Sequence, residues 1–262
     1  MTRIIAVANQ KGGVGKTAST VNLAARLTTM GRRVLVLDAD PQANATSILD
    51  VELHHDSRTL NDVLAAVATN QAGPGAISAA ITAAGPAWPG LDAVPSERAL
   101  AAREADTSAG REQLLRIALG DGAVDCYNAV LIDCPPSLGA LTLGALTAAD
   151  QVLIITEPRA SSVDGVDELT RTIRAVRQYY NPRLTLAGIL INKWRPDRLD
   201  KAAWRQVLQD SYADAVIDHP LPEREIVATA ATNRVPVPHT EARDYINALD
   251  AVARELIQEA RQ

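Results

Sequence analysis

A glycine-rich segment near the start of the chain carries the residue types that bind phosphate: Lys11-Gly12-Gly13-Val14-Gly15-Lys16-Thr17. Glycines let consecutive backbone N–H groups turn inward around phosphate oxygens, and a helix that starts directly afterwards adds the positive end of its dipole. The usual pattern, Gly-x-x-x-x-Gly-Lys-Ser/Thr, would place its first glycine at Gln10, so this segment is a variant. We expect residues 11–18 to bind the phosphates of a nucleotide, with Lys16 at the β- and γ-phosphates and Thr17 at Mg²⁺.

Acidic residues follow two apolar runs that resemble buried strands. Asp38 comes directly after residues 34–37 and Asp40 two residues further on, and Asp133 ends the run 129–133. The carboxyl ends of parallel strands form the edge where open α/β sheets bind ligands, so these acids are expected beside the glycine-rich loop. Acids for Mg²⁺ together with lysines are the residues that phosphoryl transfer requires. For Asp38 a structural role, as a cap or turn acid at the strand end, remains open beside a chemical one.

The elements that must position these residues can be read from the hydrophobic pattern. An apolar run at 4–8, the loop, helical spacing from Val21 to Leu27 ending at Gly31, and a second run at 34–37 make one strand–helix–strand unit. Further strands are expected at 91–95, 129–133, 152–155 and 184–191, and helices at 111–119, 163–180 and 240–260. Strands that alternate with helices predict an α/β fold: a doubly wound, mostly parallel sheet with helices on both faces.

Length and composition limit the classes of protein that the chain can be. Its 262 residues, 47% hydrophobic and 22% charged, suit one globular domain over 1–262, with an Ala/Gly/Pro-rich surface insertion near 72–90. The longest uncharged stretch, 63–91, is broken by Gly and Pro, so no membrane helix is expected. Two cysteines, Cys126 and Cys134, have no metal-binding spacing and favour a reducing, cytoplasmic setting.

Three segments in the same order carry a resemblance to a known family. The loop 11–17 with Asn9-Gln10, the run 38–47, and Asp133-Cys134-Pro135-Pro136-Ser137-Leu138-Gly139 are similar to the deviant Walker A ATPases of the ParA/MinD class, and specifically to the ParA family of DNA-partition ATPases. The resemblance extends over nearly the whole chain. It implies a P-loop NTPase fold, ATP and Mg²⁺ as cofactors, and an ATP-dependent homodimer.

The resemblance also implies roles for individual residues. Lys11 would be the signature lysine that reaches the partner subunit's phosphates, Lys16 and Thr17 would serve nucleotide and metal in their own subunit, and Asp40 would orient the attacking water. Asp133 would hold Mg²⁺ through water, and Asn192 would recognise adenine, with the segment around Pro220 packing on the base. Two positions depart from the family pattern: Ala18 replaces a hydroxyl residue, and Ala43 replaces a glycine.

The charge distribution bears on a nucleic-acid partner. The whole chain has a formal net charge of −5, yet residues 159–205 contain ten basic and five acidic residues. Such local asymmetry can bind duplex phosphates with little dependence on sequence and strong dependence on salt. Arg195 and Arg198, just past a predicted strand, are the main DNA-contacting candidates, and Arg183, Arg224 and Arg243 are weaker ones. The trio Arg171, Arg174 and Arg177 is equally explained as a solvated helix face.

The function expected is therefore a DNA-partition ATPase, for a plasmid or a chromosome. Its partners would be nonspecific double-stranded DNA and a centromere-binding protein of the ParB type, and its location the nucleoid. Other members of the class remain alternatives: a membrane-cycling ATPase like MinD, or one that positions a protein organelle. A MinD-like protein needs a basic amphipathic C-terminal helix, whereas the polar face of residues 249–262 is mixed in sign. This chain lacks the cluster-ligating cysteines that an iron-protein-like reductase needs. It also lacks the C-terminal tyrosine cluster expected of a tyrosine-kinase relative.

Overall fold

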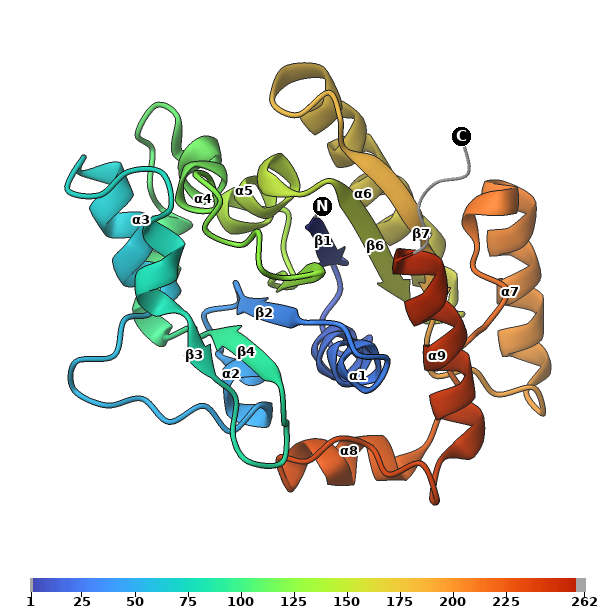
Figure 1. Ribbon diagram of the computed structural model, residues 1–262. Coiled ribbons are helices and arrows are strands. Elements are labelled where there is room, and N and C mark those ends of the chain that lie inside the picture. Colours follow the sequence, from blue (N-terminus) through green and yellow to red (C-terminus); the bar gives the residue numbers. More distant parts are fainter. Residues whose placement is uncertain (1, 258–262) are drawn as a thin grey trace.

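A seven-stranded sheet lies at the centre of the protein (Figure 1). The computed structural model describes residues 2–257. The strand order is β3-β4-β2-β5-β1-β6-β7, and every neighbouring pair is parallel except β3 with β4. The strands are β1 (Arg3–Ala8), β2 (Val34–Asp38), β3 (Thr82–Ala83), β4 (Leu91–Val94), β5 (Ala129–Asp133), β6 (Gln151–Thr156) and β7 (Thr185–Ile191). The mostly parallel sheet expected from the sequence is confirmed.

Helices cover both faces of this sheet and form two separate apolar layers (Figure 1). One layer packs α3 (Leu60–Ala68), α4 (Leu114–Ala118), α5 (Ala140–Ala148) and α6 (Ala160–Tyr179) on one face. The other packs α1 (Lys16–Thr29), α2 (Asn44–Ile48), α8 (Glu225–Thr232) and α9 (Arg243–Ile257) on the opposite face. Both layers bury side chains of β1, with Ala6 and Ala8 toward the first and Ile5 and Val7 toward the second. The central strands are therefore apolar on both faces, as the uninterrupted runs predicted.

Several elements were not expected from the sequence. They are α2, α3, α5, α8, a further helix α7 (Leu199–Tyr212), the edge strand β3, and the short 3₁₀ turns η1 (Ala76–Ala80), η2 (Arg98–Arg103) and η4 (Ala213–Ala215). The helix expected over 111–119 is formed by the 3₁₀ turn η3 (Arg111–Gln113) followed by α4. Helix α3 has a clear start, because the Thr59 hydroxyl and the Asp62 carboxylate bond each other's backbone N–H in a capping box. Helix α7 lies beyond the edge strand β7 and buries few residues, so its apolar stripe is weak (Figure 1).

The segment 72–90, expected as a surface insertion, and the closing helix, expected over 240–260, lie at the periphery of the fold. The segment 72–90 supplies η1 and β3 at the sheet edge, and it buries Ile77 and Trp88. The closing helix, expected over 240–260, is α9 from Arg243 to Ile257, while 258–262 lie outside the described residues. Along residues 2–257, no helix combines the length and the apolar character needed to cross a membrane.

The register of the central strands sets the position of the polar residues. Asp38 pairs directly with Asp133 across β2 and β5, and Val7 pairs with Asp133 across β1 and β5. The three strands therefore end at the same edge, where the loop after β1 also begins. This edge carries the site described next.

Candidate functional site

The glycine-rich loop joins β1 to the first turn of α1. Gly13 and Gly15 have φ of 77° and 85°, in the left-handed region, and α1 begins at Lys16. At Gly15 the lack of a side chain is also a steric need, since a Cβ there would lie 2.2 Å from the amide nitrogen of Asn192. The loop therefore takes a conformation that favours glycine at these points, with the N-terminus of a fourteen-residue helix behind it.

Two residues from the end of β7 hold the outer side of this loop. The Asn192 side-chain amide donates to the carbonyl oxygen of Val14 (2.8 Å), and the Lys193 ammonium donates to that of Gly13 (2.5 Å). The Lys193 ammonium also lies 2.6 Å from the carboxylate of the buried Glu157. The sequence prediction assigned no role to Lys193 or Glu157. Only the adjacency of Lys193 to Asn192 pointed to it.

Lys16 and Asp133 form the charged centre of the site. Lys16 is buried, and its ammonium donates to the carbonyl of Lys11 (3.3 Å). Burial lowers the pKa of Lys16, and the nearby Asp133 opposes that change. Asp133 is fully buried; burial above all, and then the charge of Asp38, raise its pKa to about 7, an effect that the nearby Thr17 hydroxyl opposes.

One oxygen of Asp133 has no partner among the described residues. Thr20 donates its hydroxyl to Oδ1 (3.3 Å), whereas Oδ2 is buried without any hydrogen bond there. A buried carboxylate oxygen without a donor is unfavourable. It therefore marks a place suited to a cation or to water bound to one.

The two acids after β2 have different surroundings. Asp38 accepts from the backbone N–H and the hydroxyl of Thr46 (2.8 and 2.7 Å) and from the N–H of Asp40 (3.1 Å). Both its oxygens hold the loop that leads into α2, which is the structural role left open by the sequence. Asp40 is also buried, but Gln42 N–H is the one described donor to its carboxylate, at Oδ1 (2.9 Å). Oδ2 of Asp40 is left for another ligand.

The loop from Asp40 to α2 is fixed by residues that the sequence did not single out. Ser96 donates its hydroxyl to the carbonyl of Asp40 (2.7 Å), and its N–H bonds the Thr46 hydroxyl (2.9 Å). Ala43, one of the two departures from the family pattern noted above, has φ of 55°. A side chain in this left-handed region costs about 1–2 kcal/mol, so the departure at Ala43 strains the loop instead of relaxing it.

Lys11 turns inward within its own chain. Its N–H bonds the side chain of Asn9 (2.9 Å), and its aliphatic chain packs at the first turns of α6, with Cε 3.6 Å from where a Cβ of Gly165 would stand. The Lys11 ammonium is buried and has no hydrogen-bond partner among the described residues. The lysine side chain therefore packs directly against α6 at Gly165.

The structure brings the Pro220 segment beside Asn192. Leu221 N–H bonds the carbonyl of Ile191 (2.8 Å), and Trp194 N–H bonds that of Leu221 (2.9 Å). Pro220 lines an open hollow of about 570 Å³ together with Trp194 and Pro222. The polar amide and these flat apolar side chains, far apart in sequence, thus share one end of the sheet.

The arginines expected to contact DNA lie in three places. Arg195 and Arg198 follow β7 at the same end as the loop, but each is ion-paired: Arg195 with Asp197 (2.9 Å) and Arg198 with Asp200 (3.6 Å). Arg224 pairs with Asp244, directly after Arg243 at the start of α9. Arg183 precedes β7 and so lies at the opposite end of that strand, about 20 Å away by strand length.

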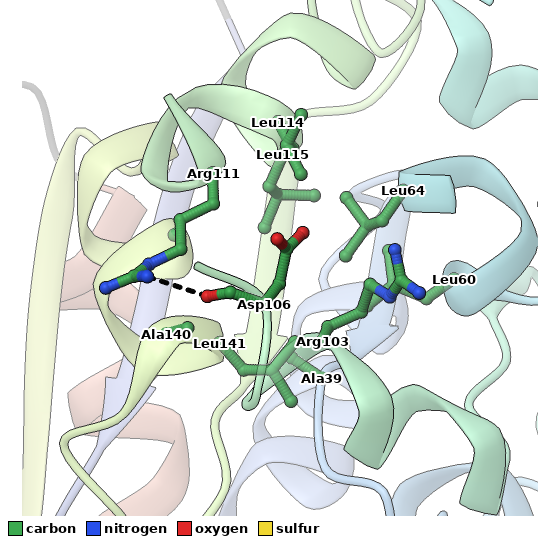
Figure 2. A pocket seen from close by; sticks show the side chains of 11 residues that line it. Ala39, Leu60, Leu64, Arg103, Asp106, Arg111, Leu114, Leu115, Ala140 and Leu141 are labelled. Atoms are coloured by element: carbon green, nitrogen blue, oxygen red, sulfur yellow. Dashed lines mark hydrogen bonds between the residues drawn. The ribbon is translucent and has the colours of Figure 1, made fainter. Parts of the chain in front are cut away.

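A small hollow lies beside Ala39, which precedes Asp40, and three charged residues, Arg103, Asp106 and Arg111, line part of it (Figure 2). Leucines of α3, α4 and α5 line it beside Ala39 and Ala140, and the Arg111 guanidinium donates to the Asp106 carbonyl (2.7 Å). Its volume of about 20 Å³ leaves room for a single water at most. The hollow is therefore too small for a ligand.

These features fit a nucleotide with its metal ion. The left-handed glycines, the helix N-terminus and buried Lys16 suit anionic phosphates, and the orphaned Oδ2 of Asp133 suits a hydrated cation. Within residues 2–257, no group of three or more His, Cys, Asp or Glu side chains could hold a metal. Mg²⁺ commonly binds through one or two carboxylates together with waters and substrate phosphates, so the free oxygen of Asp133 beside the loop fits it.

Comparison with known proteins agrees with this geometry. Residues 2–186 match the AAA domain family. The chromosome partitioning protein ParA of Caulobacter vibrioides is 38% identical over 241 residues, which cover 90% of this chain and 86% of that protein. A structure from Mycobacterium smegmatis, described as cobyrinic acid a,c-diamide synthase with an ATP analogue and magnesium, is 33% identical, with a TM-score of 0.79 and coverage of 97% and 95%.

The fold is shared more widely than the sequence. McdA of Cyanothece superimposes with a TM-score of 0.85 at 21% identity, with 100% of this chain and 99% of that one covered. This likeness concerns the fold alone. The family match and the identity to ParA over most of both chains decide the assignment. The chain belongs to the ParA-type family of P-loop ATPases.

Proposed function

We propose that this protein is a DNA-partition ATPase that hydrolyses ATP to ADP and phosphate in the presence of Mg²⁺. The observation that carries the proposal is the meeting of the glycine-rich loop, Lys16, Asp133 and Asp40 at one sheet edge. In the proposed cycle, ATP favours a homodimer, the dimer binds nonspecific DNA of the nucleoid, and a ParB-type partner stimulates hydrolysis and release.

The residues that would hold the cofactors follow from the site. The N–H groups of residues 12–18 and the Lys16 ammonium would bind the phosphates, and Thr17 and Asp133 would hold Mg²⁺, Asp133 through water. The metal, when bound, supplies charge neutralisation for phosphoryl transfer. Asp40 has an unused carboxylate oxygen with which to orient the attacking water and is a further possible metal contact.

Lys11 would provide the link between hydrolysis and dimerisation. In the single chain its ammonium is buried beside Gly165 and lacks a hydrogen-bond partner among the described residues. A buried ammonium without a partner is costly, so anionic phosphates of a partner subunit would draw it out. The same residue then adds positive charge at the γ-phosphate, as an arginine finger does.

Asn192 favours adenine by the direction of its amide. Its nitrogen is committed to the Val14 carbonyl, which can only accept, so the amide orientation is fixed. No described residue donates to its oxygen, which is therefore an acceptor for an exocyclic amine. Adenine has an amino group where guanine has a carbonyl oxygen, and Pro220 would pack on the base.

DNA binding is proposed for the end of the sheet that carries Arg195 and Arg198, with Arg224 and Arg243 at its border. Neutralising phosphates with arginine releases counterions, so such binding weakens steeply with salt. Because the arginines are already paired with carboxylates, we expect a single subunit to have moderate affinity for DNA. An ATP-dependent dimer would raise that affinity, because it presents two copies of the arginine surface.

A DNA-binding assay with ATP, with ADP and without nucleotide, repeated over a salt series, tests the proposal. We expect binding that requires ATP and falls with salt. Equal binding in all three states, or none, would contradict partition activity. Anionic vesicles in a parallel assay test the membrane-cycling alternative: ATP-dependent binding to vesicles in place of DNA would favour a MinD-like function.

A further inference from the structure

Two consecutive residues hold two consecutive carbonyls of the phosphate loop. Asn192 donates to Val14 (2.8 Å) and Lys193 to Gly13 (2.5 Å), across 178 and 180 residues of sequence. A trans peptide unit is planar, and its carbonyl points opposite to the N–H of the following residue. Holding the Gly13 and Val14 carbonyls outward therefore turns the N–H groups of Val14 and Gly15 the other way, into the loop.

Both the side chain and the backbone of Lys193 are held in place by neighbouring residues. Its ammonium lies 2.6 Å from Glu157, which is 5% exposed and also pairs with Arg159 (2.8 Å). Its carbonyl accepts from the Lys201 ammonium. Its φ of 52° is in the left-handed region, a conformation that non-glycine residues adopt at some energetic cost. The backbone thus accepts strain in a geometry that directs this side chain back to the loop.

The ion pair with Glu157 gives the contact its strength. A charged donor makes a shorter and stronger hydrogen bond to a carbonyl than a neutral one does. Glu157 lies at the end of β6 and is nearly excluded from water, so the Lys193 ammonium has a fixed counter-charge beside the loop. Lys193 at one strand end and Glu157 at the next therefore act as one unit, which we call the carbonyl clamp.

We propose that Lys193, secured by Glu157, is a positioning residue that presents the Val14 N–H group to the phosphates of the bound nucleotide, beside the Gly15 N–H group that Asn192 presents. The proposal rests on the nucleotide site proposed above. The clamp holds the loop in the same way before and during phosphoryl transfer. Its loss should weaken nucleotide binding and leave the rate of the bound complex nearly unchanged.

Lys193→Met tests the clamp, because methionine keeps most of the length and removes the charge. We expect the Kd of MgADP and the KM for ATP to rise about tenfold, or about 1.4 kcal/mol, while kcat changes much less. Lys193→Arg, which keeps the cation, should recover most of the affinity. Arg177→Met on the exposed end of α6 is the matched control, with the same loss of charge and no expected change.

Glu157→Gln tests whether the ion pair with Glu157 contributes to the action of Lys193, or whether the Lys193 hydrogen bond acts alone. We expect it to weaken MgADP binding less than Lys193→Met does, and the double variant to bind no more weakly than Lys193→Met, because Glu157 acts through Lys193. Additive losses, unchanged affinity in Lys193→Met, or a fall in kcat without a change in Kd would overturn the clamp. If the wild-type protein binds no nucleotide at all, the proposed ATP site fails instead.

Discussion

Asp38 and Asp133 stand directly opposite each other at the ends of adjacent parallel strands, and both are buried. Two carboxylates so placed cannot both be charged at low cost without a cation. Asp38 is satisfied by Thr46 and the backbone of Asp40, whereas Asp133 keeps one oxygen without a donor in the described chain. The pair therefore combines an acid that shapes the loop with one that is available to a metal.

The stability of the nucleotide-free protein should depend on pH through Asp38. Burial, as the largest cause, raises its pKa from 3.8 to about 6. The folded protein then holds a proton that the unfolded chain releases, so the stabilisation is complete below pH 3.8 and disappears as pH rises through about 6. Two units of pKa correspond to roughly 3 kcal/mol.

Urea unfolding of the wild type and Asp38→Asn between pH 4 and 7 measures this contribution. We expect the wild type to lose a few kcal/mol relative to the variant across that range, because asparagine does not ionise. Parallel curves for the two proteins would show that Asp38 does not titrate within it.

Lys16→Met should lower the affinity for ATP about a hundredfold, because a charged hydrogen-bond donor to the phosphates contributes about 1.5–3 kcal/mol. Titration with a fluorescent ATP analogue measures the loss. Near-ultraviolet circular dichroism of the variant checks that the fold remains. Wild-type affinity in a folded Lys16→Met protein would remove the loop from nucleotide binding.

Asp40→Ala should bind ATP but hydrolyse it about a hundredfold more slowly, since a positioned acid or base contributes about 10²–10⁴ in rate. The uncleaved complex should accumulate as a dimer, which light scattering detects. Asp40→Asn is the matched variant, because asparagine can still accept from the Gln42 N–H. Slow hydrolysis in both variants indicates a chemical role, whereas recovery in Asp40→Asn indicates a structural one.

Neutralising Arg195 and Arg198 together, as Arg195→Gln with Arg198→Gln, should weaken ATP-dependent DNA binding. The slope of log affinity against log salt should fall by about two, one for each lost phosphate contact. Asp197→Asn should act in the opposite direction, because Asp197 competes with phosphate for Arg195. An unchanged salt slope in the double variant would place the DNA surface elsewhere.

Thr59→Ala should destabilise the protein by about 1 kcal/mol, the usual effect of losing a helix N-cap. The Thr59 hydroxyl accepts from the Asp62 N–H and donates to Glu97 (2.8 Å), so its loss also releases the loop after β4. Denaturant unfolding measures the change. Thr69→Ala, at the exposed end of α3, is the control and should have little effect.

The sequence alone determined the phosphate loop, the strand–helix–strand unit around it, and the acids at the strand ends. These features are local: glycine at positive φ, apolar runs of strand length, and an acid following each run are all recorded in neighbouring residues. Helices α3 and α7 were not predicted, although α3 has a local start signal and α7 has little signal at all. The signal for α3 is a four-residue capping box, and α7 packs at the sheet edge with few buried side chains.

Only the tertiary structure decided which distant residues complete the site. The partners of Gly13 and Val14 lie 180 and 178 residues away, and Glu157 secures one of them from another strand. Likewise, the sequence counted Arg224 as positive charge, while the fold pairs it with the carboxylate of Asp244, twenty residues away. Hydrogen bonds and ion pairs depend on separations of a few ångströms, and for residues far apart in sequence only the packing of the strands sets those separations.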